Sequence, residues 1–399
     1  MIRSTKTTLK FSNIAKLENI DLFINEYRRV VSLFVDKLWN LDDVKCLLDK
    51  SLTSTVDSWL SARSIQCAGK QASGIVRGCK KKQSKRLFQI RKFKKLGMPK
   101  KARILQTIYN NTKLSKPNIQ VIQPELDSRF VEIDLNNTTS FDGWLTLTSL
   151  GNGLKIVVPF KKTKHFNKML EKGILKKGIR ISKKSITFNF AIKIPKLKEV
   201  GKTIGLDKGI KNVYTLSDNQ ESNNDIHDWN LDKIIKVMNK KTKGSKSYKK
   251  SQDHRKNYIN WCMNQIDFSD IKVLNIEKIK NMRKGKKTSK YLSKFTYTLI
   301  DIKTKNLTLE RGVRVNELSP VCTSQRCSRC GWTCKSNRNG KSFICGKCGY
   351  ALDADKNASI NISFDLPEIK VEQLKQKNKI GFYWNVLGKE PIVSSVQKV

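Results

Sequence analysis

Histidine and long apolar runs are scarce in this sequence, and each scarcity excludes a class of protein. The 399 residues include only three histidines, and none of them lies near a motif for a serine or cysteine nucleophile. Catalysis by a Ser-His-Asp or Cys-His arrangement is therefore not supported. No stretch approaches the roughly 20 uninterrupted apolar residues that span a bilayer, and Met1 opens on a polar segment without the apolar core of a signal peptide. We expect no membrane partner.

Acidic residues are also few. Asp and Glu number 34 against 80 Lys and Arg, which gives a formal net charge of +46. This excess is far larger than solubility requires and indicates binding to a polyanion, with nucleic acid as the first candidate. Hydrophobic residues make up 38% of the chain, which is enough to bury real cores. The length allows about two or three domains.

The first part of the chain is predicted to be a strand followed by helices. Residues 3–11 alternate and are rich in Thr, which favours a strand. Residues 78–103 carry twelve Lys or Arg and no acid, so a helix there would bury one face and offer phosphates the other. The alternative for such a charge run is a helix face that contacts only solvent. An earlier amphipathic helix is predicted from apolar residues at three-to-four spacing, which are Phe23, Tyr27, Val30, Val31, Phe34 and Leu38.

The periodicity of the sequence pattern changes after Pro117 and Pro124. Beyond them, segments separated by Gly, Asn and Lys turns predict β-strands. Because strand 3–11 is too short to stand alone, we expect it to pair with these later strands. The result would be a small β-barrel into which the helical block is inserted. The predicted strands cover residues 129–134, 143–148, 154–160 and 179–194.

From Gly201 onward the pattern predicts an α/β domain. Two strands joined by a tight Lys208–Gly209 turn come first, with Asp207 near the end of the first strand. A basic helical stretch then runs from Lys233 to about Gln265. A short buried strand ends in Glu277, and beyond a further helix residues 313–318 form another strand.

The cysteines indicate a metal site. Six of the ten fall between residues 322 and 348, which favours metal binding in a reducing compartment over a disulfide scaffold. Two Cys-x2-Cys pairs are separated by fourteen residues, close to the spacing of a zinc ribbon in which each knuckle offers two thiolates. Cys334 could replace one ligand by a change of register, but only the two x2 pairs give symmetric knuckles. The predicted ligands of a structural Zn²⁺ are Cys327, Cys330, Cys345 and Cys348.

Three acids stand where a catalytic centre could form. Asp207 and Glu277 each end a predicted strand, and Asp355 opens the segment Asp-Lys-Asn-Ala-Ser-Ile-Asn-Ile. Phosphodiester hydrolysis can run on two divalent ions held by such carboxylates. A single Asp at a strand end is more often a turn former or a helix cap, so the prediction depends on all three meeting in space.

These segments, in this order and with the cysteine ribbon between the second and third, resemble the RuvC-like nuclease domain of transposon-encoded TnpB proteins and of compact type V CRISPR effectors. The resemblance covers residues 201–363 by motif, and residues 1–200 by architecture only. The matching motifs are Gly-Leu-Asp-Lys-Gly-Ile-Lys-Asn at 205–212, Ile276-Glu277 before Lys280-Asn281-Met282, Thr-Ser-Gln-Arg-Cys-Ser-Arg-Cys-Gly at 323–331, and Asp-Ala-Asp-Lys-Asn-Ala-Ser-Ile-Asn-Ile at 353–362.

The resemblance implies an α+β multidomain fold and an active site. Asp207, Glu277 and Asp355 would bind two catalytic Mg²⁺ ions in an RNase H-like (RuvC) α/β domain, with Asp353 as a substitute for Asp355 or as the cap of the following helix. A β-barrel (wedge) interrupted by a helical recognition lobe would precede that domain. The implied division is a wedge over 1–16 and 117–200, a recognition lobe over 17–116, a nuclease domain over 201–320 and 350–399, and a zinc ribbon over 321–349.

The resemblance also implies function and partners. The chain would be an RNA-guided DNA endonuclease that binds a guide RNA and target double-stranded DNA, where base pairing supplies specificity and the protein reads a short flanking motif. It would act as a monomer or as a homodimer on one RNA, in the cytoplasm of a prokaryote and near the nucleoid. Two alternatives remain open: an RNA-guided DNA-binding regulator that does not cut, and a guide-independent transposase or junction nuclease.

Overall fold

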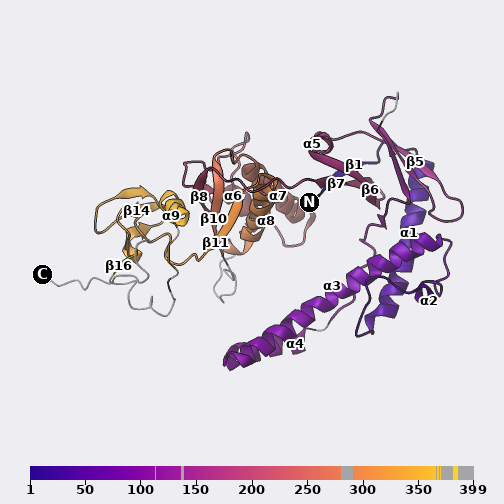
Figure 1. Ribbon diagram of the computed structural model, residues 1–399, viewed down its shortest axis with the longest axis horizontal. Helices are drawn as coiled ribbons and strands as arrows, with labels where there is room; N and C mark the ends of the chain where they lie inside the picture. Colours follow the sequence, from indigo (N-terminus) through magenta and orange to yellow (C-terminus); the bar gives the residue numbers. More distant parts are fainter. Residues whose placement is uncertain are drawn as a thin grey trace. The chain divides into compact units, whose positions relative to one another are not determined.

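The computed structural model describes residues 1–112, 114–135, 139–279, 291–364, 366–367, 369 and 381–384 (Figure 1). The chain divides into two compact units, Met1–Lys193 and Ile194–Val399, and each is described by itself. The motif residues Lys280, Asn281 and Met282 lie outside the described residues, as does most of the segment after Leu366.

Helices form one part of the first unit. In α1 (Ile14–Trp39) all six residues of the predicted apolar stripe are buried, so this helix is confirmed. Asn13 caps it by accepting from the backbone N–H of Lys16. A short α2 (Lys50–Thr53) leads to the long α3 (Ala62–Lys95), and α4 (Pro99–Asn111) begins with a proline in its first turn.

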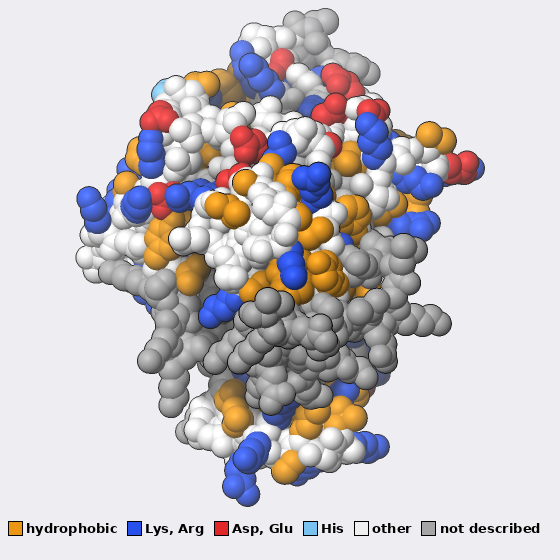
Figure 2. All heavy atoms as spheres, turned by 90° about the vertical axis from the view of Figure 1, so that its left-hand side faces the viewer, with side chains coloured by type: hydrophobic (Ala, Val, Ile, Leu, Met, Phe, Trp, Pro, Cys, Tyr) orange, Lys and Arg blue, Asp and Glu red, His pale blue; other side chains and the backbone are white. Residues whose placement is uncertain are grey.

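The cations of residues 78–103 lie at the end of α3 and in α4. Ile90 and Ala102 are the buried residues there, while Phe88 is 68% exposed. The predicted buried face is therefore narrow. Among the described residues, none of the twelve Lys and Arg side chains lies in an ion pair. Figure 2 shows one face of the molecule, on which Lys and Arg side chains are spread among polar, apolar and acidic ones.

The strands of the first unit form two antiparallel sheets. One sheet has the order β1-β7-β6-β2, and the other has the order β3-β4-β5. The pairing of the first strand with a late one is confirmed, because Ile2 lies opposite Ala191 and Thr8 opposite Ser185. The strands are β1 (Ile2–Thr8), β2 (Glu125–Leu126), β3 (Val131–Asp134), β4 (Gly143–Leu147), β5 (Ile156–Phe160), β6 (Gly173–Ser182) and β7 (Ser185–Ile192).

The expectation of a β-barrel is wrong for the described part of the chain, where no closed barrel forms. After β5 the chain enters α5 (Lys164–Lys172) before it returns as β6. The ring of Phe160 on β5 lies 4.9 Å from that of Phe188 on β7, and Phe166 of α5 lies 5.3 Å from Phe188. Aromatic packing therefore joins these strands where a barrel would need hydrogen bonds between neighbouring backbones.

A mixed sheet of order β11-β10-β8-β9 organises the second unit. Strands β8 (Lys202–Asp207), β10 (Ile271–Glu277) and β11 (Arg314–Leu318) are parallel, and β9 (Thr215–Leu216) is antiparallel to β8. One face packs on helices through Ile204, Leu206, Leu274 and Ile276. These helices are α6 (Leu231–Asn239), α7 (Lys246–Asn264) and α8 (Tyr297–Glu310), and α9 (Ala354–Ser363) contacts β8 and β10 (Figure 1).

Two local predictions for this unit need correction. The basic stretch from Lys233 is two helices, α6 and α7, with Gly244 at a positive φ of 91° between them. The Lys208–Gly209 turn does not form, because Asp207 pairs with Thr215 and a longer loop joins β8 to β9. Lys208, the first residue of that loop, is buried.

Short strands lie between the sheet and α9 in the sequence, and one more follows α9. The strands β13 (Arg338–Asn339), β14 (Ser342–Ile344) and β15 (Ala351–Asp353) form an antiparallel sheet, and β12 (Trp332–Thr333) pairs with β16 (Phe382–Tyr383). Short 3-10 helices cover Leu292–Lys294 and Lys335–Asn337. In the part of the chain that the structure describes, no helix is long and apolar enough to cross a membrane.

Candidate active site and metal centre

Two of the predicted acids end neighbouring parallel strands. Gly205 of β8 lies opposite Asn275 of β10, so Asp207 and Glu277, each two residues further on, project from the same face of the sheet. This face is opposite to the one that carries the apolar core of the unit. The sheet alone therefore brings these two carboxylates together.

Helix α9 packs on that face and carries the third acid. A Cβ at Gly205 would lie 2.1 Å from the carbonyl oxygen of Ser359, so only glycine lets the helix approach this closely. Asn275 donates from Nδ2 to the carbonyl oxygen of Ile362 at 2.9 Å. Asp355 lies in the first turn of the helix and is 7% exposed.

Asp353, the substitute considered for Asp355, has a different place. It is the N-cap of α9, and its Oδ1 accepts from the backbone N–H groups of Asp355 at 2.9 Å and Lys356 at 3.2 Å. A carboxylate at this position satisfies the free donors of the first turn and favours the helix dipole. Asp353 therefore fixes the start of the helix that carries Asp355.

The charges of the other two carboxylates act on Asp207. Burial raises the pKa of Asp207 to about 8, and the negative charges of Glu277 and Asp355 add to this effect. Burial also raises the pKa of Glu277, while a hydrogen bond of 2.5 Å from the Thr323 hydroxyl opposes the rise. Buried acids whose charges repel are stabilised by a cation between them, and carboxylate oxygens are the ligands that Mg²⁺ prefers. The chemistry of these donors suits a divalent ion, although in this conformation the three carboxylates are not among the described groups whose ligand atoms all lie within 4.8 Å of one another.

Two cations from the ribbon contact Asp355, and the sequence did not indicate them. Arg338 Nη2 lies 3.3 Å from Asp355 Oδ1, and Lys341 Nζ pairs with Oδ2. They flank the turn between β13 and β14, where Gly340 has a positive φ of 58°. A hairpin turn with basic residues on both sides, placed shortly before the last acid, is the sequence signal that could have suggested them.

The four predicted cysteines come together. Their four sulfur atoms all lie within 4.8 Å of one another. Among the described residues, this is the group of three or more possible metal ligands that comes so close together. The two knuckles match: the N–H groups of Gly331 and Gly349 donate to the carbonyl oxygens of Cys327 at 2.9 Å and Cys345 at 3.0 Å. Both glycines have positive φ, 81° and 66°. Such a cluster could hold a tetrahedral zinc ion.

Thiols of this cluster differ in pKa, and burial raises the pKa of Cys327 and of Cys330. A backbone hydrogen bond involving Tyr350 helps to lower the pKa of the Cys348 thiol to about 7, which favours the thiolate that a metal needs. Cys334 lies apart from the four and contacts the Ser336 hydroxyl at 3.1 Å. The register change through Cys334 is therefore not used in this conformation.

Asparagines of α9 tie the ribbon to the carboxylate face. Asn361 Nδ2 donates to the carbonyl oxygens of Thr323 at 2.9 Å and Arg326 at 2.7 Å, and its Oδ1 accepts from Arg326 Nη1 at 2.7 Å. Asn357 accepts from the Ser328 N–H at 3.0 Å one turn earlier. The motif Asn-Ala-Ser-Ile-Asn thus joins the metal centre to the helix that carries Asp355.

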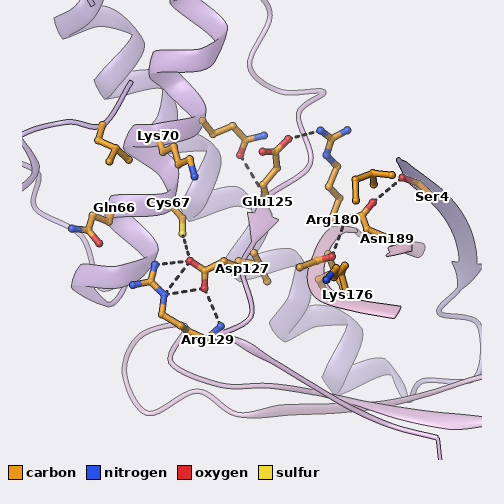
Figure 3. A pocket seen from close by; sticks show the side chains of 16 residues that line it. Ser4, Gln66, Cys67, Lys70, Glu125, Asp127, Arg129, Lys176, Arg180 and Asn189 are labelled. Atoms are coloured by element: carbon orange, nitrogen blue, oxygen red, sulfur yellow. Dashed lines mark hydrogen bonds and ion pairs between the residues drawn. The ribbon is translucent and has the colours of Figure 1, made fainter. Parts of the chain in front are cut away.

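A cavity of about 610 Å³ in the first unit is a separate feature, and none of these carboxylates lines it. Figure 3 shows its arginines directed at acids: Arg129 lies 2.5 Å from Asp127, and Arg180 lies 2.6 Å from Glu125. Burial raises the pKa of the Cys67 thiol there to about 11, so Cys67 is a poor nucleophile. The cavity has no evident catalytic group.

The second unit is therefore an α+β structure with carboxylates at the ends of parallel strands and a four-cysteine ribbon anchored on one helix. Comparison with known proteins agrees. Residues 302–362, which include the ribbon, match the family model described as Cas12f1-like, TNB domain.

Curated relatives match parts of the chain. The CRISPR-associated endodeoxyribonuclease Cas12f1 of Sulfoacidibacillus thermotolerans is 30% identical over 36% of this chain and 34% of its own length. The TnpB-like protein aq_aa05 of Aquifex aeolicus (strain VF5) is 38% identical over 22% of this chain and 31% of its own length. The chain thus matches about a third of each relative. The resemblance to TnpB proteins and compact type V effectors is confirmed.

A solved structure is similar over a longer range. The cryo-EM structure of a Cas12f1–sgRNA–target DNA complex covers 92% of this chain and 99% of that chain, with 14% identity and a TM-score of 0.47.

Proposed function

We propose that this protein is an RNA-guided DNA endonuclease whose cutting centre consists of Asp207, Glu277 and Asp355. The observation that carries the proposal is the convergence of these acids from two strand ends and one helix onto one face of a sheet. Separate stretches of sequence have no structural need to place three buried acids so that their charges repel. Metal-dependent phosphodiester hydrolysis explains the arrangement.

The proposed cofactors are two Mg²⁺ ions on the three carboxylates and one structural Zn²⁺ on the four cysteines. When bound, the Mg²⁺ ions would supply an activated water and stabilise the leaving oxygen. The chain itself fixes the acids at strand and helix ends. Arg338 and Lys341 place positive charge beside Asp355, where it would favour binding of a phosphate group.

We further propose that the sheet and α9 are an RNase H-like (RuvC) domain built from residues 201–320 and 350–399, with the zinc ribbon at 321–349. The order strand, strand, ribbon, helix supports this division. Asp207, Glu277 and Asp355 lie in β8, β10 and α9, in the order in which the motifs of the family follow one another. For residues 1–200 we retain the division into a wedge (1–16 and 117–200), without a closed barrel in its described part, and a recognition lobe (17–116).

The proposed partners are a guide RNA and target double-stranded DNA. The net charge of +46 indicates a large polyanion. The cations of residues 78–103, which lie in no described ion pair, are mostly exposed on helices, where phosphates can reach them. The names of the relatives agree with this proposal: one is an endodeoxyribonuclease, and another solved structure is a complex with sgRNA and target DNA. Monomer and homodimer on one RNA both remain compatible with it.

Substitution of Asp207 by Ala tests the proposal. We expect Asp207→Ala to lose DNA cleavage and to keep RNA binding, because the change removes a metal ligand and leaves the basic surfaces intact. Asp228→Ala is the matched control, since Asp228 is an exposed acid of the same unit that pairs with Lys233. Both variants should be assayed for cleavage and for bound RNA by sequencing.

Each other outcome has a definite reading. Undiminished cleavage by Asp207→Ala refutes the active-site assignment. A wild-type protein that binds one defined RNA and its DNA target without cutting supports the regulator alternative. Cleavage by protein that carries no defined RNA supports a guide-independent nuclease.

A further inference from the structure

Lys208 follows Asp207 directly and has no exposed side-chain surface. Its Nζ donates to the backbone carbonyl oxygen of Glu277 at 2.6 Å and to Asp301 Oδ1 of α8 at 2.6 Å. Its backbone N–H donates to Asp207 Oδ1 at 2.9 Å. One residue therefore contacts both strand-end acids, through a carboxylate in one case and a backbone carbonyl in the other.

The position of these contacts is unusual within the sheet. The paired residues of β8 and β10 end with Leu206 opposite Ile276. Asp207 and Glu277 lie one step beyond, where their strands pair outward with β9 and β11 instead. The printed pairing of these two strands ends at this point, and the Lys208 ammonium reaches across from the end of β8 to the backbone carbonyl oxygen of Glu277.

Burial of a lysine is unfavourable unless its charge is compensated. A leucine or methionine could fill the same space without that penalty. Asp301 supplies the compensating charge, and 24% of its side chain is accessible. Packing alone therefore does not explain the ion pair between Lys208 and Asp301.

We propose that Lys208 is a positioning residue that sets the separation of the Asp207 and Glu277 carboxylates for divalent-ion binding, with Asp301 holding its ammonium in place. The inference rests on the proposed nuclease function and goes beyond it, because it gives a role to a residue outside the proposed metal ligands. Partners that orient metal ligands in this way typically change metal affinity about 10- to 100-fold when removed.

Metal binding without DNA tests this role. Lys208→Met keeps the length of the side chain and removes the ammonium. We expect it to weaken Mn²⁺ binding to the guide-free, zinc-loaded protein about tenfold or more by calorimetry. Lys236→Met is the matched control, because Lys236 pairs with Asp232 at 2.8 Å in the same unit but is 66% exposed. It should leave the affinity unchanged.

Two further variants make the result decisive. Lys208→Arg keeps a cation and should bind Mn²⁺ more tightly than Lys208→Met. If Lys208→Met does not fold, Asp301→Asn replaces it, and weaker Mn²⁺ binding by that variant supports the role. Affinity within twofold of the Lys236→Met control in the folded variant tested overturns it.

Asp207→Ala separates this proposal from the proposed function. If Asp207→Ala abolishes Mn²⁺ binding and cleavage while Lys208→Met leaves both unchanged, only the positioning role fails. If Asp207→Ala keeps both, the proposed active site itself is wrong.

Discussion

Arg338 and Asp355 form an ion pair of 3.3 Å between the ribbon and the first turn of α9. Lys341 pairs with the second oxygen of the same carboxylate. Two cations of the ribbon thus hold Asp355, the third carboxylate of the proposed metal site. A divalent ion that binds all three acids has to compete with these cations for Asp355.

Removal of one competing cation should strengthen metal binding. A partly exposed ion pair contributes at most about 1 kcal/mol, which corresponds to roughly a fivefold change in an equilibrium constant. We expect Lys341→Gln to bind Mn²⁺ up to about fivefold more tightly, measured by calorimetry on guide-free protein. Lys335→Gln, in the same ribbon, should have no effect. Weaker binding by Lys341→Gln would show instead that Lys341 helps to assemble the site.

The raised pKa of Asp207 makes the metal-free protein sensitive to pH. Because this pKa is about 8 in the fold and near 3.8 in the unfolded chain, the folded protein binds a proton that the unfolded chain has released. The contribution of Asp207 to the free energy of unfolding is therefore complete below the pKa of the unfolded chain. It is lost as the pH rises from there toward the pKa of the folded protein. Each pH unit can remove at most about 1.4 kcal/mol.

Asp207→Asn removes this titration while it keeps the shape of the side chain. Between pH 6 and pH 8, wild-type protein without divalent ions should lose stability relative to Asp207→Asn, measured by thermal unfolding. Added Mg²⁺ should restore wild-type stability at pH 8 and leave the variant largely unaffected. A difference between the two proteins that stays constant with pH contradicts the prediction.

The ribbon should contain one zinc ion per chain. Cys330→Ser should lose it, since a tetrahedral site with three thiolates binds zinc far more weakly. Cys334→Ser is the matched control, because Cys334 lies in the same ribbon and outside the cluster. Zinc content is measured by mass spectrometry of the purified proteins. Zinc loss from Cys334→Ser would show that the register alternative is the correct ligand set.

The sequence indicates those parts of the site that depend on residues close to one another in the chain. A Cys-x2-Cys pair makes its knuckle within a few residues, so the four ligands were visible as a pattern. Strand-end acids are also local signals, and the shared face of Asp207 and Glu277 follows from alternation along paired strands. Asp355 was chosen over Asp353 by resemblance, and the structure gives Asp353 a capping role.

Contacts between distant segments were not visible. Lys208 contacts Asp301, 93 residues away, whereas in the sequence its place before Gly209 predicts a tight turn. The barrel was expected because alternating strands do not reveal where a sheet ends. The rings of Phe160 and Phe188 decide that question through packing between strands that share no hydrogen bonds.

The approach of α9 to the sheet gives a last prediction. A Cβ on Gly205 would lie 2.1 Å from the Ser359 carbonyl oxygen and 2.4 Å from the Ser363 nitrogen, and both are backbone atoms that cannot rotate away. Gly205→Ala must therefore push α9, with Asp355, away from Asp207 and Glu277. We expect a loss of roughly 1–3 kcal/mol in the free energy of unfolding, as for other overpacked sites, together with weaker Mn²⁺ binding.

Gly78→Ala is the control for this change. Gly78 lies in α3 with nothing within 4 Å of an added Cβ, so alanine there should stabilise the helix by about 0.5–1 kcal/mol. Both free energies are measured by denaturant unfolding. If Gly205→Ala is as stable as wild type and binds Mn²⁺ normally, α9 does not need this close contact, and the carboxylates tolerate a looser arrangement than the one described.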